Sequence, residues 1–405
     1  MSIEPARHVA LVVENLPLAR DHRLRKQAGA LARAGYRVTV ICRADPDNHT
    51  LPGIRVREYR PPVDGRSPLG YAREYGYSLA AAARLASSTF VTDRFDAIQV
   101  SGTPDIYFTV AAPFRRLGAR LVFDQRDLSP ELYELRYGRR DAVYRLLRRF
   151  ERQSYRAADH VLTVNRSLER IAYERGGLPP GRVTVVGNGP RLGDVERAGP
   201  RPELRHGRRQ LCVWIGVMGP QDRVELALEA VARVVRGGHT DTHFAFVGDG
   251  ESRAPAQRLA TELGLDQYVS FPGWLSEAEV HAYLATADLG LEPNLEAIVS
   301  PVKAMEYMAL GVPVVAFDLT ETRRLAGDAA AYARPGDVDG FAAAAATLLD
   351  DPARRAALGR NGRQRVADAL SWERQELAYL DVYRRLVGPA APDRSRPPVA
   401  VEAGR

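Results

Sequence analysis

The chain has 405 residues, 45% of them hydrophobic and 26% charged, a balance typical of a globular protein with two or three domains. It contains no run of about 18 apolar residues, which excludes a transmembrane helix. Glu4 lies just before a strand-like apolar run, so a signal peptide is not expected. Two cysteines, Cys42 and Cys212, indicate a reducing compartment, and the net charge of +7 favours an anionic partner.

Strands and helices alternate through the first half of the chain. Strands are expected at 8–13, 37–42, 97–100 and 120–123, and helices at 19–34, 71–90 and 105–117. This alternation predicts a parallel sheet with helices on both faces. Ligands of such sheets bind at the carboxyl ends of the strands, so the loops after Val13, Val100 and Phe123 are the candidate binding loops.

The loop at 124–132, after the last of these strands, is rich in charged residues and contains Arg126, Asp127 and Glu131. Two interpretations stay open. The loop could line a cleft, or it could be a solvated turn in which Ser129 caps a helix.

A helix at 141–158 has an apolar face and an opposite face of arginines. Such a charged face usually points to water. The excess of arginine also fits an anionic surface, such as an inner-leaflet lipid or a pyrophosphate-linked lipid. No motif for nucleic acid accompanies the charge. The apolar residues are Val143, Leu146, Leu147, Phe150, Ala157 and Ala158, and the basic ones are Arg145, Arg148, Arg149, Arg152 and Arg156.

A stretch rich in arginine, glycine and proline follows the strands at 161–164 and 183–186 and predicts a domain boundary. We therefore expect a first domain at 1–190, a linker at 191–210 and a second domain at 211–370. A last helix is expected at 371–388 and a disordered tail at 389–405. Strands of the second domain are expected at 211–215, 244–247, 268–271, 288–291 and 313–317, and helices at 222–236, 276–286, 338–350 and 352–369.

The segment 292–318 predicts a loop, a helix and a buried strand. Ser300 is expected as the N-cap and Pro301 as the first helical residue, while Gly311 ends the helix. A helix start favours an anion, and Lys303 adds a positive charge in the first turn. Glu306 lies one turn further on, where it could accept hydrogen bonds from ribose hydroxyls. Alternatively, Lys303 and Glu306 form an ordinary surface pair.

Three segments resemble glycosyltransferases of family 4. They are SPVKAMEYMALGVPVVAFDLTET at 300–322, FDQRDLSPELYELRYG at 123–138 and IGVMGPQDRVELALEAV at 215–231. The resemblance extends over about residues 8–387. It implies an α/β protein of the GT-B fold, with two facing Rossmann-like, doubly wound domains and a C-terminal helix that crosses back onto the first domain.

The resemblance also implies an activity. It predicts a cytoplasmic, metal-independent and cofactor-free retaining enzyme that moves a hexosyl or N-acetylhexosaminyl group from a nucleotide sugar, a UDP-sugar, to a glycan or lipid-linked acceptor. An anionic membrane face is a further expected partner, and nucleic acid is not. The catalytic residues would be Lys303, Arg126 and Asp127, and the acceptor-side residues Asn15, Asp21, Gly102 and Glu131. The donor-binding residues would be Gly216, Gly219, Arg223, Gly248, Trp274, Leu275, Glu296, Ser300, Pro301, Val302, Lys303 and Glu306.

The chain departs from the family pattern in three places. Ile298 replaces the first of two glutamates, with Glu296 as the nearest acid, and Gln125 and Arg126 replace two histidines. Val217 and Asp222 stand where relatives carry basic residues. Two alternatives therefore stay open: a non-catalytic relative that binds nucleotide sugars or membranes, and a sugar-nucleotide epimerase. Two Asp-x-Asp strings, at 45–47 and 337–339, are interpreted as caps rather than metal ligands.

Overall fold

The computed structural model describes residues 6–62, 68–195 and 199–390, so most of the expected tail at 389–405 lies outside the described residues. The chain forms two compact units. The first comprises Met1–Val164, Leu168–Val186 and Glu376–Arg405, and the second comprises Asn165–Ser167 and Gly187–Gln375. The expected linker at 191–210 lies in the second unit, where it contains the short helix α7(Leu192–Val195) and a 3-10 turn. Among the described residues, no helix combines the length and the apolar character needed to cross a bilayer.

The first unit is a seven-stranded parallel sheet, as the alternation predicts. Its strand order is β3-β2-β1-β4-β5-β6-β7, and the interior strand β1 is buried at every residue. The chain therefore winds outward from β1 and from β4 in opposite directions. The strands are β1(His8–Val13), β2(Arg37–Arg43), β3(Ile54–Tyr59), β4(Ala97–Ser101), β5(Arg120–Gln125), β6(His160–Thr163) and β7(Val183–Val185).

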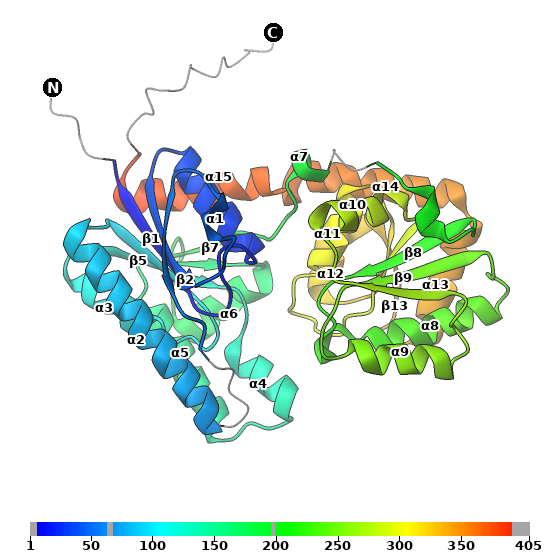
Figure 1. The fold of residues 1–405 in the computed structure, drawn as a ribbon, viewed down its shortest axis with the longest axis horizontal. Helices are drawn as coiled ribbons and strands as arrows, with labels where there is room; N and C mark the ends of the chain where they lie inside the picture. Colours follow the sequence, from blue (N-terminus) through cyan, green and yellow to red (C-terminus); the bar gives the residue numbers. More distant parts are fainter. Residues whose placement is uncertain (1–5, 63–67, 196–198, 391–405) are drawn as a thin grey trace, which may run out of the picture. The chain divides into compact units, whose positions relative to one another are not determined.

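Helices cover both faces of this sheet (Figure 1). On one face, Gln99 of β4 bonds Gln27 of α1(His22–Arg33) and accepts hydrogen bonds from Tyr379 and Tyr383 of α15(Trp372–Val387). The other face packs against α2(Pro68–Thr92), α3(Phe108–Arg116) and α5(Ala142–Ala157). The remaining helices of the first half are α4(Ser129–Tyr137) and α6(Arg166–Gly176).

The predicted apolar face of α5 is wrong in its first half. Val143 is 45% exposed and Leu146 is 47% exposed. The helix instead buries Glu151, Ser154 and Tyr155. The reason is that only its C-terminal turns pack against the sheet, where the Tyr155 hydroxyl donates to Gln125 at the end of β5. The first two turns therefore present apolar side chains to the surface.

The second unit is a six-stranded parallel sheet in the order β10-β9-β8-β11-β12-β13. One face packs against α8(Val224–Arg236), α9(Arg253–Glu262) and α13(Val338–Asp350). The opposite face packs against α10(Glu277–Thr286), α11(Val302–Ala309) and α12(Thr320–Ala326). The strands are β8(Gln210–Ile215), β9(Thr242–Val247), β10(Val269–Gly273), β11(Leu289–Glu292), β12(Val314–Phe317) and β13(Ala330–Ala333).

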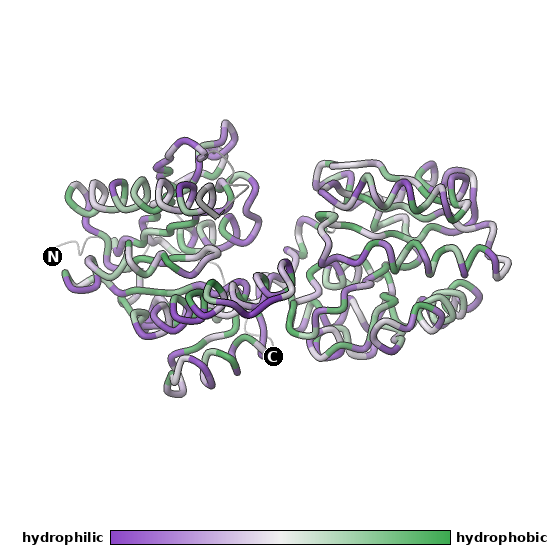
Figure 2. Tube along the Cα trace, turned by 90° about the horizontal axis from the view of Figure 1, so that it is seen from below, coloured by the Kyte–Doolittle hydropathy of each residue, from purple (hydrophilic) through white to green (hydrophobic). Residues whose placement is uncertain are grey.

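Helices of both units alternate hydrophilic and hydrophobic stretches along the chain (Figure 2), as expected for helices that cover a sheet. One close contact fixes α11 on its sheet. A Cβ at Gly290 of β11 would lie 2.2 Å from the ring of Tyr307 on α11, so only glycine allows this packing. The helix that carries Lys303 is thereby held directly against the strand that ends at Glu292.

The last helix confirms the expected crossing. After α14(Pro352–Arg365) and a π turn at 366–370, α15 begins at Trp372 in the second unit. From Glu376 onward its residues belong to the first unit, where Tyr379, Val382 and Tyr383 are fully buried. Two parallel doubly wound sheets joined by such a helix are the predicted fold class.

Candidate functional site

The order of strands marks one edge of the second sheet as the candidate binding site. The chain leaves β8 toward β9 and β10 on one side and later builds β11, β12 and β13 on the other. The carboxyl ends of β8 and β11 therefore flank the switch point, where ligands of open α/β sheets bind. Gly216 follows β8, and Glu292 is the last residue of β11.

Three glycine turns are joined at this edge. Gly216 and Gly248 have φ values of 141° and 140°, and a Cβ at Gly248 would lie 1.8 Å from the Gly216 carbonyl oxygen. The Gly216 N–H donates to Val247, and the Gly248 N–H donates to Gly273 at 3.0 Å. The Met218 N–H donates to Asp249 at 2.9 Å. The backbone of the loop at 216–219 is thus packed tightly against its neighbours, with no side chains between them.

Helix α11 starts one residue later than predicted. Its N-cap residue is Pro301, which has no side-chain cap, and its first residue is Val302. The expectation that Ser300 is the N-cap and Pro301 the first helical residue is therefore wrong. The Ser300 hydroxyl instead accepts a hydrogen bond from Asn165 at 2.9 Å, and the same amide donates to the Ile298 carbonyl. The Val302 N–H donates to the Ser300 carbonyl, and no side chain caps the helix, so the next N–H groups of the first turn of α11 are available to an anion.

The Lys303 side chain extends from the start of α11 toward the carboxylates of Asp222 and Glu292. Its Nζ lies 2.6 Å from Asp222 Oδ1 and 5.1 Å from the ring centre of the buried Trp214. Only 14% of its side chain is exposed. Burial lowers the pKa of this ammonium, but the carboxylates of Glu292 and Asp222 outweigh burial and raise the pKa above its ordinary value. Lys303 therefore pairs with Asp222, and the Glu306 carboxylate also contributes to the rise of the Lys303 pKa.

Glu292 is a buried carboxylate at the switch point. It is 2% exposed, and neither carboxylate oxygen has a hydrogen-bond partner among the described residues. Burial raises its pKa, and the Lys303 ammonium opposes this only in part. A buried polar group without a partner is costly unless a ligand or water completes it. Glu292 is therefore a candidate functional residue, and it is not among the site residues expected from the sequence.

The other expected donor residues lie around these turns. Gly219 caps the 3-10 turn at 220–222, and Arg223 has a left-handed backbone (φ 52°) and pairs with Glu225 at 2.7 Å. Trp274, after the turn at Gly273, is 69% exposed, so it does not pack into the core. Leu275 packs against the hydrophobic core. Val302, Glu296 and Glu306 are half-buried, and the Glu296 N–H donates to the Asn294 side chain.

In the first unit, the charged loop after β5 belongs to a buried network. Arg126 pairs with Asp124 at 3.2 Å and also with Asp21, the N-cap of α1. Arg23 binds the opposite side of Asp124 at 2.6 Å, and the Gln27 amide donates to it at 3.1 Å. Burial would raise the pKa of Asp124, but Arg23 and Arg126 outweigh burial and lower it to about 2. Arg126 is thus a charge already shared by two aspartates.

The remaining first-unit predictions are scattered along this sheet edge. Asn15 and Asp127 are exposed, and Gly102 has a φ of 136° next to the Cβ of Glu14. Glu131 is paired with Arg175 at 2.6 Å. Ser129 is not an N-cap, because its hydroxyl donates to Asp105 and the helix has Leu128 at that position. Another buried pair at this edge, Glu14 with Arg43 at 2.5 Å, was not predicted.

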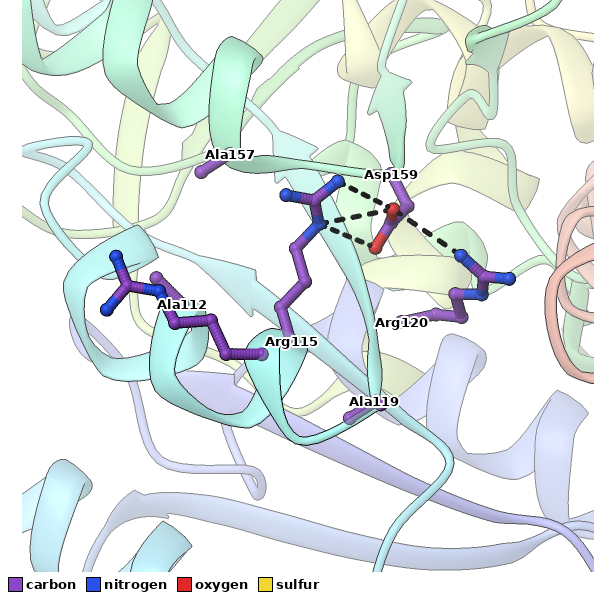
Figure 3. A pocket seen from close by; sticks show the side chains of 8 residues that line it. Ala112, Arg115, Ala119, Arg120, Ala157 and Asp159 are labelled. Carbon is purple, nitrogen blue, oxygen red and sulfur yellow. Dashed lines mark hydrogen bonds and ion pairs between the residues drawn. The ribbon is translucent and has the colours of Figure 1, made fainter.

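Two cavities lie on the first unit. One, of about 580 Å³, is lined by Gln153 and the five predicted arginines of α5, and none of the five has a carboxylate within ion-pair distance in the described part of the chain. The other, of about 410 Å³, lies at the opposite edge of the sheet from the strand ends. There Arg115 and Arg120 both point at Asp159 (Figure 3), at 3.1 and 3.8 Å. Two of its three arginines, Arg115 and Arg120, are already paired with Asp159, and the cavity lies away from the carboxyl ends of the strands, so we do not take it as the candidate site.

Two signals could have pointed to the residues that were missed. Glu292 is a charged residue at the end of an apolar strand, which marks the carboxyl edge of a parallel sheet. Asp222 follows a glycine-rich loop after a strand. The ion pair between Asp222 and Lys303 joins residues 81 positions apart, and no local pattern encodes that pairing.

The comparisons with known proteins agree with this architecture. Residues 21–189 match the family described as glycosyl transferase 4-like domain, and residues 209–351 match the family described as glycosyl transferases group 1. These two matches together cover more than half of the chain. In solved structures, the chain is similar to sucrose-phosphate synthase from Thermosynechococcus elongatus, with a TM-score of 0.77, 21% identity and coverage of 94% of this chain and 99% of that one.

Curated relatives match over shorter stretches. The MMP alpha-(1->4)-mannosyltransferase of Mycolicibacterium hassiacum is 34% identical over 176 residues, 42% of each chain. The GDP-mannose-dependent alpha-(1-6)-phosphatidylinositol monomannoside mannosyltransferase of Mycolicibacterium smegmatis is 30% identical over 196 residues, 44% of this chain and 51% of that protein. The chain therefore spans about half the length of these relatives. With both of its halves matched and the two-sheet fold in place, the chain belongs to the GT-B glycosyltransferases that combine a glycosyl transferase 4-like domain with a group 1 domain.

Proposed function

We propose that this protein transfers a hexosyl group from a nucleoside diphosphate sugar to a hydroxyl of a glycan or lipid-linked acceptor. The observation that carries the proposal is the second unit's switch point, where an uncapped helix start, a buried ammonium and a glycine loop converge. Such groups match the diphosphate of a donor. The family's curated relatives include a GDP-mannose-dependent enzyme, and family resemblance suggests UDP. Both kinds of donor carry a nucleoside diphosphate, which is the group that this site would bind.

In the proposed reaction the bond between the sugar C1 and the terminal phosphate oxygen breaks, and the acceptor oxygen bonds to C1 on the same face. The acceptor proton passes to the departing phosphate oxygen, so no separate protein base is needed. The charge that develops on the phosphate is met by the α11 N–H groups and Lys303. Glu306 would hold the ribose and Trp274 with Leu275 the base, and no metal or other cofactor takes part.

We propose the first unit as the acceptor side, with Arg126 and Asp127 beside the acceptor and Asn15, Asp21, Gly102 and Glu131 at its strand ends. The acceptor hydroxyl would come from a lipid-linked or polysaccharide chain. This suits the basic face of α5, which would meet an anionic membrane from the cytoplasmic side. The support for that step is the arginine-lined cavity on α5.

Release of nucleotide from UDP-, GDP- and dTDP-sugars, with and without an acceptor panel, tests the proposal. Lys303→Met should reduce release by roughly 100- to 1000-fold, because one lost donor to developing charge costs about 3–4 kcal/mol. Methionine keeps the length and helix preference of the side chain. The matched control is Lys26→Met, which removes the same charge from the first unit. Failure of the wild type to release nucleotide from any donor would instead support the non-catalytic alternative.

A further inference from the structure

Asp222 holds two groups that a phosphate would need. One carboxylate oxygen accepts from Lys303 Nζ at 2.6 Å. The other accepts from the backbone N–H of Gly219 at 3.3 Å. A carboxylate that bridges an ammonium and a loop N–H occupies the same kind of position as two oxygens of a bound phosphate. The side chain is itself only 15% exposed, so this bridge is shielded from bulk water.

The two carboxylates near Lys303 belong to different kinds of secondary structure. Asp222 ends a three-residue 3-10 turn and precedes Arg223. Glu292, in contrast, is the last residue of the central strand β11, which pairs with β8 and β12. The Asp222 carboxylate can therefore move away from Lys303, whereas the sheet fixes the position of Glu292. The Cε of Lys303 passes close to Gly216, where a Cβ would lie 3.1 Å from it.

We infer that Asp222 is an internal stand-in for the terminal phosphate of the donor, which must displace this carboxylate from Lys303 and from the Gly219 N–H in order to bind. The inference rests on the proposed function and adds a specificity-determining residue to it. A ligand with a terminal phosphate can exchange with Asp222. A nucleoside monophosphate lacks the group that would reach Lys303, so it binds without displacing the carboxylate.

If the donor phosphate displaces Asp222, then substituting this residue should strengthen nucleotide binding rather than weaken it. Removing the negative charge of Asp222 takes away both a competitor for Lys303 and a repulsion toward the incoming phosphate. At an effective dielectric constant of about 20 and a separation of about 5 Å, such a charge changes an equilibrium constant by roughly 200-fold, and by less where water screens it. Asp222→Asn should therefore bind nucleoside diphosphate about 10- to 100-fold more tightly, while nucleoside monophosphate binding changes by less than about 3-fold.

Titration calorimetry of the full chain with UDP, GDP, UMP and GMP measures both effects. Glu229→Gln is the matched control, because it removes the same charge from α8 and from a pair with Arg233 rather than from Lys303. Asp222→Ser is the second variant if Asp222→Asn melts at a lower temperature than the wild type. Diphosphate binding that is unchanged or weaker in both variants, with wild-type binding intact, overturns this inference alone. Absence of nucleotide binding by the wild type overturns the proposed function as well.

Discussion

Several side chains contact the Asp124 carboxylate, which lies at the centre of the ion-pair network in the first unit. Arg23 and Arg126 flank it, Gln27 donates to it, and Gln27 in turn accepts from Gln99. The chain of contacts extends from the loop after β5 to the tyrosines of α15. Arg126, which sequence comparison suggested as a catalytic cation, is therefore positioned by this network rather than free.

This arrangement predicts an acid-sensitive contribution to stability. The pKa of Asp124 is lowered from 3.8 to about 2, so its ion pairs stabilise the fold fully above about pH 4. That stability should be lost progressively as the pH falls toward 2. Asp124→Asn should destabilise the protein by about 3–5 kcal/mol at pH 7, because it leaves the buried Arg23 guanidinium without its carboxylate and Arg126 with Asp21 alone.

Urea unfolding of the wild type and Asp124→Asn at pH 7 and near pH 3 tests the prediction. The difference between the two proteins should shrink at the lower pH, since near pH 3 the Asp124 carboxylate of the unfolded wild type is largely protonated, whereas that of the folded protein is still mostly ionised. Asp47→Asn is the control, because Asp47 is exposed and makes no side-chain ion pair among the described residues. A difference that is independent of pH would assign the effect to packing instead of charge.

At the scale of elements, α4 and α5 bring basic and exposed apolar side chains together on one part of the first unit. The arginines of α5 line a cavity, and apolar side chains are exposed beside them on both helices. Basic residues attract an anionic membrane surface at about 1 kcal/mol each, and exposed apolar residues can enter the interface. The exposed apolar residues are Leu132, Leu135, Tyr137, Val143 and Leu146.

We therefore expect the protein to sediment with vesicles that contain anionic lipid and not with neutral vesicles. Replacing Arg145, Arg149, Arg152 and Arg156 by glutamine should abolish most binding at low salt. Replacing Leu135 and Leu146 by serine should remove the part that persists at high salt, since Debye screening weakens only the charged part. The control removes Arg115 and Arg116 of α3 instead. Equal sedimentation of wild type and the arginine variant would make the face of α5 merely solvated.

The elements predicted from sequence are those whose own residues carry the pattern. The buried runs of β1, β4, β5 and β12 were predicted, as was the helix at 276–286 that forms α10. Strand β3 was missed because it is only partly buried and carries Arg55 and Arg57. Strand β13 was missed because its alanines do not favour strand over helix. The sequence predicted that the site lies at the carboxyl ends of the strands. It did not predict which side chains pair there, such as Asp222 with Lys303.

At the scale of the whole molecule, the two units are not two consecutive pieces of sequence. Tyr379 and Tyr383 of α15 are fully buried in the first unit, and both donate to Gln99 in the middle of β4. Tyr36 of the first unit also donates to the carbonyl of Gly388. The sheet of the first unit therefore depends on residues almost 300 positions away in the chain.

A cut within the last helix should consequently damage the distant first unit. Removing residues 376–405 uncovers the face of β4 that α15 covers and removes the two tyrosine hydroxyls that donate to Gln99. Large-to-small changes of single core aromatics cost about 3–5 kcal/mol, and here three buried side chains are lost together. We expect this truncation to unfold the first unit, whereas removing only 391–405 should leave the melting temperature unchanged. Limited proteolysis with mass spectrometry separates the two units: cleavage should appear first between residues 6 and 164 in the longer truncation. Initial cleavage in the second unit, or equal melting of both truncations, would show that α15 is not part of the first unit's core.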